Sequence, residues 1–208
     1  MSRLVLVRHG ETVWHAENRY AGRTDVALTQ RGLAQAERLG AWARGAGLDA
    51  VWSSPLSRAR LTASPAAEDL VLPLQIEERL IELDFGRGEG KTDAEMHHEF
   101  PEQRTAFLLD PIGHHLPGGE DPRHAAERGV AALRAIAGAT DPNGRVLVVA
   151  HNTLLRLVLC SLLGIPLARY RSIFPSFANC TMTEIAITET NVGLLSFNVP
   201  LIEIQEKV

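Results

Sequence analysis

The chain has 208 residues and a formal net charge of −4, with 45% hydrophobic and 22% charged residues. A chain of this length can bury a sizeable core without metal or disulfide bonds, and its composition excludes long disordered, collagen-like and coiled-coil proteins. The acidic balance argues against a general nucleic-acid binder. The longest apolar run, residues 154–165, contains Arg156 and is too short to span a bilayer. We therefore expect a cytoplasmic protein without nucleic-acid or membrane partners.

Short apolar runs and amphipathic stretches alternate along the chain, which is typical of an α/β fold. In chain order, the predicted strands span residues 4–7, 49–54, 72–76, 145–150, 182–187 and 194–199. One predicted helix begins after Thr29 and ends before Gly45, and the others span 56–70, 125–137 and 153–163. Pro65 lies inside the second helix and predicts a kink or a restart. This order predicts a three-layer α/β/α sandwich with a mostly parallel central sheet.

A loop and a small insertion interrupt this alternation. Residues 82–91 are rich in glycine and are expected to form the loop. Residues 92–119 carry prolines and glycines between short helical patterns. We therefore expect a single domain over residues 1–208, in which residues 92–119 form a small helical lid. Cys160 and Cys180 lie in apolar runs, and we expect both to be core residues in a reducing compartment.

Two of the predicted strands end in a histidine. Arg8 and His9 follow the run 4–7, and His151 follows the run 145–150. Ligands of open α/β sheets bind beyond the carboxyl ends of the strands, where these side chains are expected to lie. A guanidinium group beside an imidazole makes an anion site that contains a nucleophile. Alone, each residue is also consistent with a structural histidine or a solvated charge.

Further residues extend this pattern into an ordered set of motifs. Arg58 comes just after a predicted strand, near a helix start, and Glu82 is one of five acidic residues between Glu77 and Glu89. Together the motifs resemble the histidine phosphatase superfamily, which includes the cofactor-dependent phosphoglycerate mutases. The matching segments are LVRHGETVW at 6–14, NRYAG at 18–22, LTQRG at 28–32, SSPLSRARLTA at 53–63, ELDFGRGEG at 82–90, PGGE at 117–120 and VVAH at 148–151.

The resemblance implies a chemistry for five of these residues. His9 attacks phosphorus and becomes a phosphohistidine, and a backbone carbonyl is expected to fix its tautomer. Arg8, Arg58 and His151, the last protonated or donating, surround the transferring phosphoryl group. Glu82 is the proton donor, with a pKa raised by partial burial under the lid. Neither a metal ion nor another cofactor is expected.

Three more positions are phosphate-binding candidates by the same resemblance. His15 stands where the family usually has a phosphate-contacting asparagine, and its charge is expected to titrate near neutral pH. Gly22 matches a glycine whose amide lies near substrate in relatives. Asn152 replaces the usual glycine after the second histidine, which suits a positive φ. Gly88 stands where tryptophan is common, which predicts an open pocket wall.

The acceptor of the phosphoryl group decides the activity. Water gives a phosphatase, which is the predicted function, and a second phosphoester gives a mutase. Residues 92–119 contain one arginine, Arg104, and no lysine, which argues against a mutase. A non-catalytic phosphate-binding module is the third alternative, and the retained site residues argue against it. The substrate is expected to be a small phosphorylated metabolite, while its identity and the oligomeric state stay open. The specificity candidates are Phe85, Arg87, Lys91, Arg104 and His115.

Overall fold

The computed structural model describes residues 1–188 and 190–201. Its centre is a six-stranded sheet with the order β3-β2-β4-β1-β5-β6. The strands are β1 (Ser2–Arg8), β2 (Ala50–Ser53), β3 (Leu74–Ile76), β4 (Arg145–Ala150), β5 (Met182–Ile187) and β6 (Val192–Val199). The first four run parallel, and β5 and β6 are antiparallel to their neighbours. The predicted α/β class with a mostly parallel sheet is confirmed.

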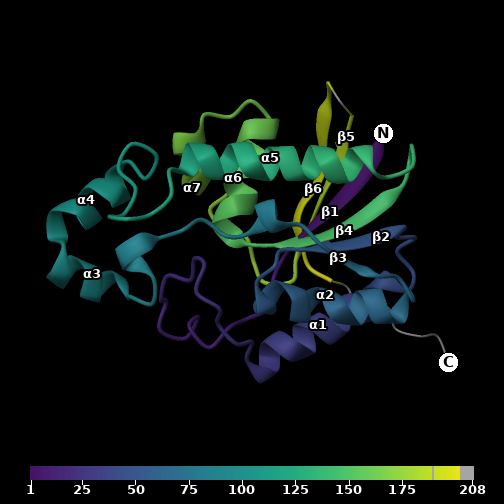
Figure 1. Cartoon of the computed structure of the whole chain (residues 1–208), viewed down its shortest axis with the longest axis horizontal. Coiled ribbons are helices and arrows are strands. Elements are labelled where there is room, and N and C mark those ends of the chain that lie inside the picture. Colours follow the sequence, from purple (N-terminus) through teal and green to yellow (C-terminus); the bar gives the residue numbers. More distant parts are fainter. Residues whose placement is uncertain (189, 202–208) are drawn as a thin grey trace.

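Helices cover both faces of the sheet (Figure 1). The helices α1 (Gln30–Ala43) and α2 (Ser57–Asp69) lie on one face, and α5 (Pro122–Gly138) and α6 (Asn152–Leu162) lie on the other. Four short helical segments lie between these elements: η1 (Glu78–Leu80), η2 (Gly86–Gly88), η3 (Leu167–Arg169) and α7 (Tyr170–Ile173). Within residues 1–188 and 190–201, no helix is long and apolar enough to cross a membrane.

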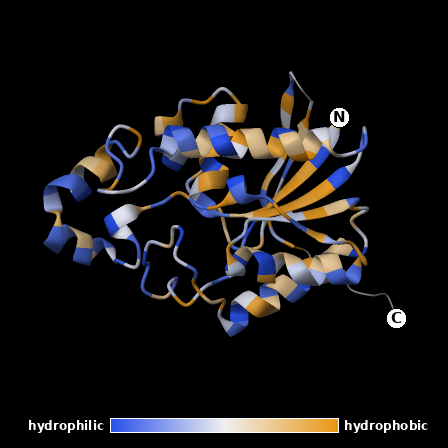
Figure 2. Ribbon diagram, in the orientation of Figure 1, coloured by the Kyte–Doolittle hydropathy of each residue, from blue (hydrophilic) through white to orange (hydrophobic). Residues whose placement is uncertain are grey.

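The alternation of side chains along β1 creates two cores. Leu4 and Leu6 belong to the cluster that α5 and α6 complete, whereas Val5 and Val7 belong to the cluster that α1 and α2 complete. All four side chains are fully buried. This explains why the run is apolar at every position, and Figure 2 shows the central strands as predominantly hydrophobic. The two cores fix the strand ends from which the site is built.

The helix α2 excludes one of the two outcomes expected at Pro65. The expected restart at Pro65 does not occur, because a single helix runs from Ser57 to Asp69 through this residue. The buried face of α2 packs closely on α1: a Cβ atom added at Gly40 would lie 2.9 Å from the Cβ atom of Pro65. Packing against α1 therefore keeps the helix continuous although Pro65 contributes no backbone N–H.

The insertion forms two short helices that extend beyond one end of the sheet (Figure 1). These are α3 (Asp93–Glu99) and α4 (Pro101–Leu109), and Thr92 with Glu95 forms a capping box at the start of α3. Met96 and Phe107 are buried and attach the insertion to the main core. The helical character predicted for residues 92–119 is thus observed.

Candidate active site

The ends of three neighbouring strands bring distant residues together. His9 follows β1, His151 follows β4 and Ser54 follows β2, and these strands are adjacent in the order β2-β4-β1. The ring centroids of His9 and His151 are 5.2 Å apart. Both rings are buried, as is the Ser54 side chain. The carboxyl edge of the sheet therefore holds a compact polar cluster inside an otherwise apolar fold.

His9 is held in one tautomer. Its Nδ1 lies 2.7 Å from the carbonyl oxygen of Gly10, and a carbonyl can only accept, so Nδ1 carries the proton and Nε2 keeps a free lone pair. Burial lowers the pKa of His9 well below its ordinary value, and the charges of Arg58 and Arg8 lower it further. The ring is therefore neutral at physiological pH, as a nucleophile must be.

The loop that carries His9 is fixed from two sides. The backbone N–H of Gly10 donates to Oγ1 of Thr62 over 2.9 Å, and that hydroxyl donates to the carbonyl of Arg58. From the other side, Nδ2 of Asn179 donates to the carbonyl of His9 over 2.7 Å. These bonds tie the loop to α2 and to the segment before β5, so the imidazole has little freedom to turn.

Two guanidinium groups flank the histidine rings. Arg8 donates through Nη1 to the carbonyl of Phe177 over 2.7 Å, and burial lowers its pKa to about 10. Arg58, in the first turn of α2, is fully buried and donates to the carbonyls of Thr24 and Gly22 over 2.8 and 2.6 Å. The Nε atoms of both arginines are buried without a hydrogen-bond partner in the described part of the chain.

Ser54 sets the hydrogen bonding of His151. Its hydroxyl lies 2.7 Å from Nε2 of His151 and accepts from the backbone N–H of Leu56. A hydroxyl that accepts from Leu56 can donate to Nε2, which leaves the proton of a neutral ring on Nδ1. That Nδ1 is buried and unpartnered within the described residues. Burial and the charge of Arg58 lower the pKa of His151 well below its ordinary value, so the neutral, donating form is favoured over the protonated one.

The unpartnered N–H groups of Arg8, Arg58 and His151 indicate that the cluster binds an anion. Leaving several buried N–H groups unpaired is costly, yet three of them, from Arg8, Arg58 and His151, belong to the residues around the His9 ring. A tetrahedral oxyanion offers enough lone pairs to satisfy all three, and guanidinium groups bind such ions well. The cluster is therefore suited to hold a phosphoryl group at the His9 ring.

The side-chain carboxylate of Glu82 contacts the first turn of α6. Its carboxylate accepts from the backbone N–H groups of Leu83 and Leu154 over 2.8 Å each and from that of Thr153 over 2.9 Å. Burial raises the pKa of Glu82, while these N–H groups and the charge of Arg58 act in the opposite direction. The raised pKa that was expected is thus found. The groups that hold the carboxylate come from α6 and from the neighbouring Leu83, and none comes from the insertion.

The ring of His15 lies between Arg8 and Thr12. Its Nε2 lies 2.7 Å from Nη2 of Arg8 and 3.3 Å from Nδ2 of Asn179, and both partners can only donate. Nε2 therefore accepts from Arg8. On the other side of the ring, Nδ1 lies 2.9 Å from the Thr12 hydroxyl and 3.0 Å from the backbone N–H of Thr12. Burial and the charge of Arg8 lower the pKa of His15. The pKa of His15 thus lies below that of a free histidine, which favours the neutral ring, and the ring positions Arg8 through the bond to Nη2.

Three further sequence interpretations need correction or refinement. Gly22 contributes its carbonyl to Arg58, and, like Arg58 and His151, it is not among the residues that line the pocket. Asn152 does line the pocket, but as the first residue of α6 it lacks the suggested positive φ. A Cβ atom at Gly88 would lie 2.5 Å from a methyl group of Leu116. Leu116 thus fills the space of the missing side chain, and no pocket wall is open there.

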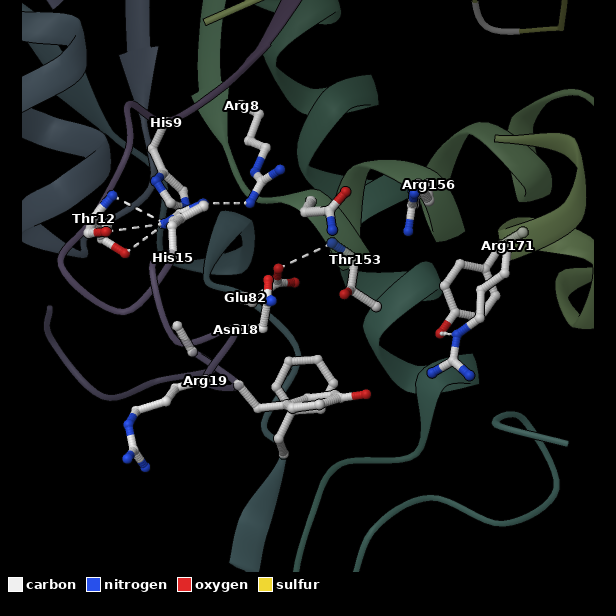
Figure 3. A pocket seen from close by; sticks show the side chains of 15 residues that line it. Arg8, His9, Thr12, His15, Asn18, Arg19, Glu82, Thr153, Arg156 and Arg171 are labelled. Carbon is white, nitrogen blue, oxygen red and sulfur yellow. Dashed lines mark hydrogen bonds between the residues drawn. The ribbon is translucent and has the colours of Figure 1, made fainter. Parts of the chain in front are cut away.

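The pocket beside this cluster is a cavity of about 270 Å³. Figure 3 shows His9 and His15 on one side of it, Arg156 and Arg171 on the other, and Arg8 and Glu82 between them. Tyr20 and Phe85 add aromatic surface. The sequence analysis did not identify Arg156 and Arg171 as pocket residues. For Arg156 there was a signal, because it is a charged residue in an apolar helix, one helical turn after Asn152.

Among the residues expected to set specificity, only Phe85 lines this pocket. No residue of the insertion does so. Lys91 pairs with Glu99, and Arg104 pairs with Asp93. Arg87 lies over the ring of Phe100, and His115 is exposed. Both cysteines are free and buried, as expected. In the described ranges no cluster of His, Cys, Asp and Glu side chains could hold a metal ion.

Comparison with known proteins connects this geometry to a family. The profile of the histidine phosphatase superfamily (branch 1) matches residues 4–200. Phosphoserine phosphatase 1 of Hydrogenobacter thermophilus is 32% identical over 199 residues, covering 96% of this chain and 93% of the relative. Probable phosphoglycerate mutase GpmB of Erwinia tasmaniensis is 32% identical over 185 residues, covering 89% and 85%. The structure of Bacillus stearothermophilus YhfR matches with a TM-score of 0.89 at 28% identity, covering 96% and 98%.

Proposed function

The chain belongs to the histidine phosphatase superfamily, and on this premise we propose that it hydrolyses small phosphomonoesters through a phosphohistidine at His9. One observation carries the proposal: the Nδ1–H of His9 is bonded to the Gly10 carbonyl, so Nε2 is free beside unpartnered donors of Arg8, Arg58 and His151. A neutral nucleophile next to an oxyanion site is the arrangement that phosphoryl transfer requires.

The first half of the reaction transfers the phosphoryl group to the enzyme. Nε2 of His9 attacks phosphorus as the bond to the leaving oxygen breaks, and the carboxyl group of Glu82 gives that oxygen its proton. Arg8, Arg58 and the Nδ1–H of His151 stabilise the charge on the phosphoryl oxygens. In the second half, water attacks phosphorus and passes a proton to the Glu82 carboxylate. The P–N bond then breaks and returns its electron pair to Nε2.

A mutase is the second candidate, and the relative named as a probable phosphoglycerate mutase favours it. A mutase must hold a second phosphoester as acceptor. The insertion expected to bind that group contributes no residue to the pocket, which supports the phosphatase. A non-catalytic binding module is disfavoured because nucleophile, acid and oxyanion donors converge on one site.

The test is phosphate release from p-nitrophenyl phosphate and a panel of phosphorylated metabolites, run in parallel with isomerisation of 3-phosphoglycerate in the presence of 2,3-bisphosphoglycerate. We expect hydrolysis to dominate and to persist in excess chelator. Isomerisation faster than hydrolysis would establish the mutase, and binding without turnover would establish the module. Activity that chelator abolishes and added metal restores would contradict the proposed metal independence.

Domain organisation and location complete the proposal. Strands from residues 2 to 199 form one sheet, which supports a single domain with residues 92–119 as its insertion. Two free, buried cysteines support a reducing, cytoplasmic location. The partner that we propose is a small phosphorylated metabolite.

Ser54 provides a test of the proposed His151 geometry. We expect Ser54→Ala to lower kcat/KM about 5- to 10-fold, corresponding to the ~1 kcal/mol of one hydrogen bond, because the Nδ1–H form of His151 loses its support. Ser54→Thr keeps the hydroxyl and should retain most of the activity. Nitrogen-15 NMR of the labelled imidazole should show the Nδ1–H tautomer in the parent protein and a mixture in the alanine variant. An unchanged tautomer ratio would argue against this role.

A further inference from the structure

The far wall of the pocket carries positive charge that the proposed phosphoryl transfer does not use. Among the residues that line the pocket, Glu82 is the only carboxylate, whereas four are arginines. Arg8 belongs to the oxyanion cluster, and Arg19 is neutralised by ion pairs with Glu17 and Glu95. Arg156 and Arg171 remain, and neither forms an ion pair with a carboxylate in the part of the chain that the structure describes.

Arg156 is placed by α6. It lies one helical turn after Asn152, so both project from the same face of the helix. Its Nη2 donates to the carbonyl of Pro175 over 2.6 Å, while its Nε is buried without a partner among the described residues. Burial lowers the pKa of Arg156, and the charge of Arg171 lowers it further. A bound anion would relieve both effects.

Arg171 is placed by aromatic rings. Its guanidinium carbon lies 4.7 Å from the ring centre of Phe107 and 5.3 Å from that of Tyr170. Its Nε donates to the hydroxyl of Tyr170 over 2.9 Å. These contacts hold the guanidinium without neutralising it. Phe107 comes from α4, so the insertion serves the pocket indirectly, as the support for Arg171.

We propose that Arg156 and Arg171 bind a carboxylate of the substrate, so that the preferred substrates are small phosphomonoesters carrying a carboxylate a few bonds from the phosphate. The inference rests on the proposed phosphatase function. Arg8 and His9 line the cavity at the phosphoryl end, and Arg156 and Arg171 line the same cavity at the other end (Figure 3). The first pair would face the phosphate of the substrate and the second its carboxylate. A cavity of about 270 Å³ leaves room for only a few carbon atoms between the two groups. Guanidinium forks match the two oxygens of a carboxylate.

The experiment compares substrates that differ in the carboxylate alone. O-phosphoserine is matched with O-phosphoethanolamine, and 3-phosphoglycerate with glycerol 1-phosphate. We expect kcat/KM to favour the carboxylate member of each pair about 10- to 100-fold, as for a charged hydrogen bond. Arg156→Met and Arg171→Met should each reduce this ratio towards one, and Arg156→Lys should restore part of it. Arg169→Met, at an exposed neighbouring arginine, should leave the ratio as in the parent protein.

The outcomes separate the two proposals. A parent enzyme that hydrolyses p-nitrophenyl phosphate but shows no preference within either pair overturns the carboxylate site alone. A preference for 2,3-bisphosphoglycerate over 3-phosphoglycerate overturns it in favour of a second phosphate. If no substrate is hydrolysed, calorimetric binding of O-phosphoserine and O-phosphoethanolamine to the unaltered protein still tests the site. Thermal melting of each variant identifies any that fails to fold. If one of Arg156→Met and Arg171→Met fails to fold, the substrate ratio of the other tests the carboxylate site.

Discussion

His9→Ala is expected to lower kcat for hydrolysis of every phosphomonoester by about 10⁴-fold or more, the scale of losing a catalytic nucleophile. The reason is geometric. Nδ1 of His9 donates to the Gly10 carbonyl and leaves Nε2 with a free lone pair, whereas Nε2 of His15 accepts from Arg8 and Nε2 of His151 from Ser54. Steady-state phosphate release on a panel that includes p-nitrophenyl phosphate measures the effect.

The matched control is His98→Ala, because His98 is exposed on α3 and lines no part of the pocket. It should retain the parent activity. The His9 variant should still bind inorganic phosphate, since the donors of Arg8, Arg58 and His151 remain. A His9 variant that keeps more than a tenth of the parent kcat would rule out covalent catalysis at this residue.

Glu82→Gln is expected to slow phosphoenzyme formation from alkyl phosphates by about 10²- to 10³-fold. An alkoxide is a poor leaving group and needs the proton of Glu82, whereas p-nitrophenolate leaves more easily without it. The loss with p-nitrophenyl phosphate should therefore be much smaller. Rapid-quench measurement of the first turnover separates this step from hydrolysis of the phosphoenzyme. Equal losses on both substrate types would contradict the role as proton donor.

The same assignment predicts the pH profile. The reactive form needs neutral His9 and protonated Glu82. Burial lowers the pKa of His9, so the nucleophile stays neutral well into the acid range. Burial raises the pKa of Glu82, so its acid form persists to higher pH than that of a free glutamate. We expect kcat/KM for alkyl phosphates to be highest at acid pH and to fall as pH rises through the pKa of Glu82. Glu82→Gln should remove this decrease of kcat/KM with pH. A decrease that persists in the variant would show that another group titrates.

The central strands β1 and β4 could be predicted from the sequence because they are buried on both faces. Predicted and observed bounds coincide for β4 and β5, and the apolar run 4–7 lies within β1. Residues 4–7 and 146–150 are apolar at every position, since alternate side chains enter two different cores. The span of α2 was predicted to within one residue at each end. Its continuity through Pro65 was not, because it depends on packing against Gly40 of α1.

The proximity of His9 and His151 could be predicted because each follows the end of a strand in the same sheet. The distal end of the site could not, since Tyr170 and Arg171 lie in a short helix whose position depends on α4 and Phe107. The contacts of His15 could not be predicted for a similar reason. Its Nε2 lies near Arg8 and Asn179, and no local pattern shows that Asn179 reaches this loop from the segment before β5.

The most direct test of the account is to trap the covalent intermediate. The enzyme is mixed with phosphorus-32-labelled substrate, quenched in alkali, which preserves phosphohistidine, and digested for peptide mapping by mass spectrometry. Acid-labile label on the peptide that contains His9, in an amount approaching one per active enzyme, is the predicted result. Full turnover with no label at His9, or with label on another residue, would contradict the mechanism.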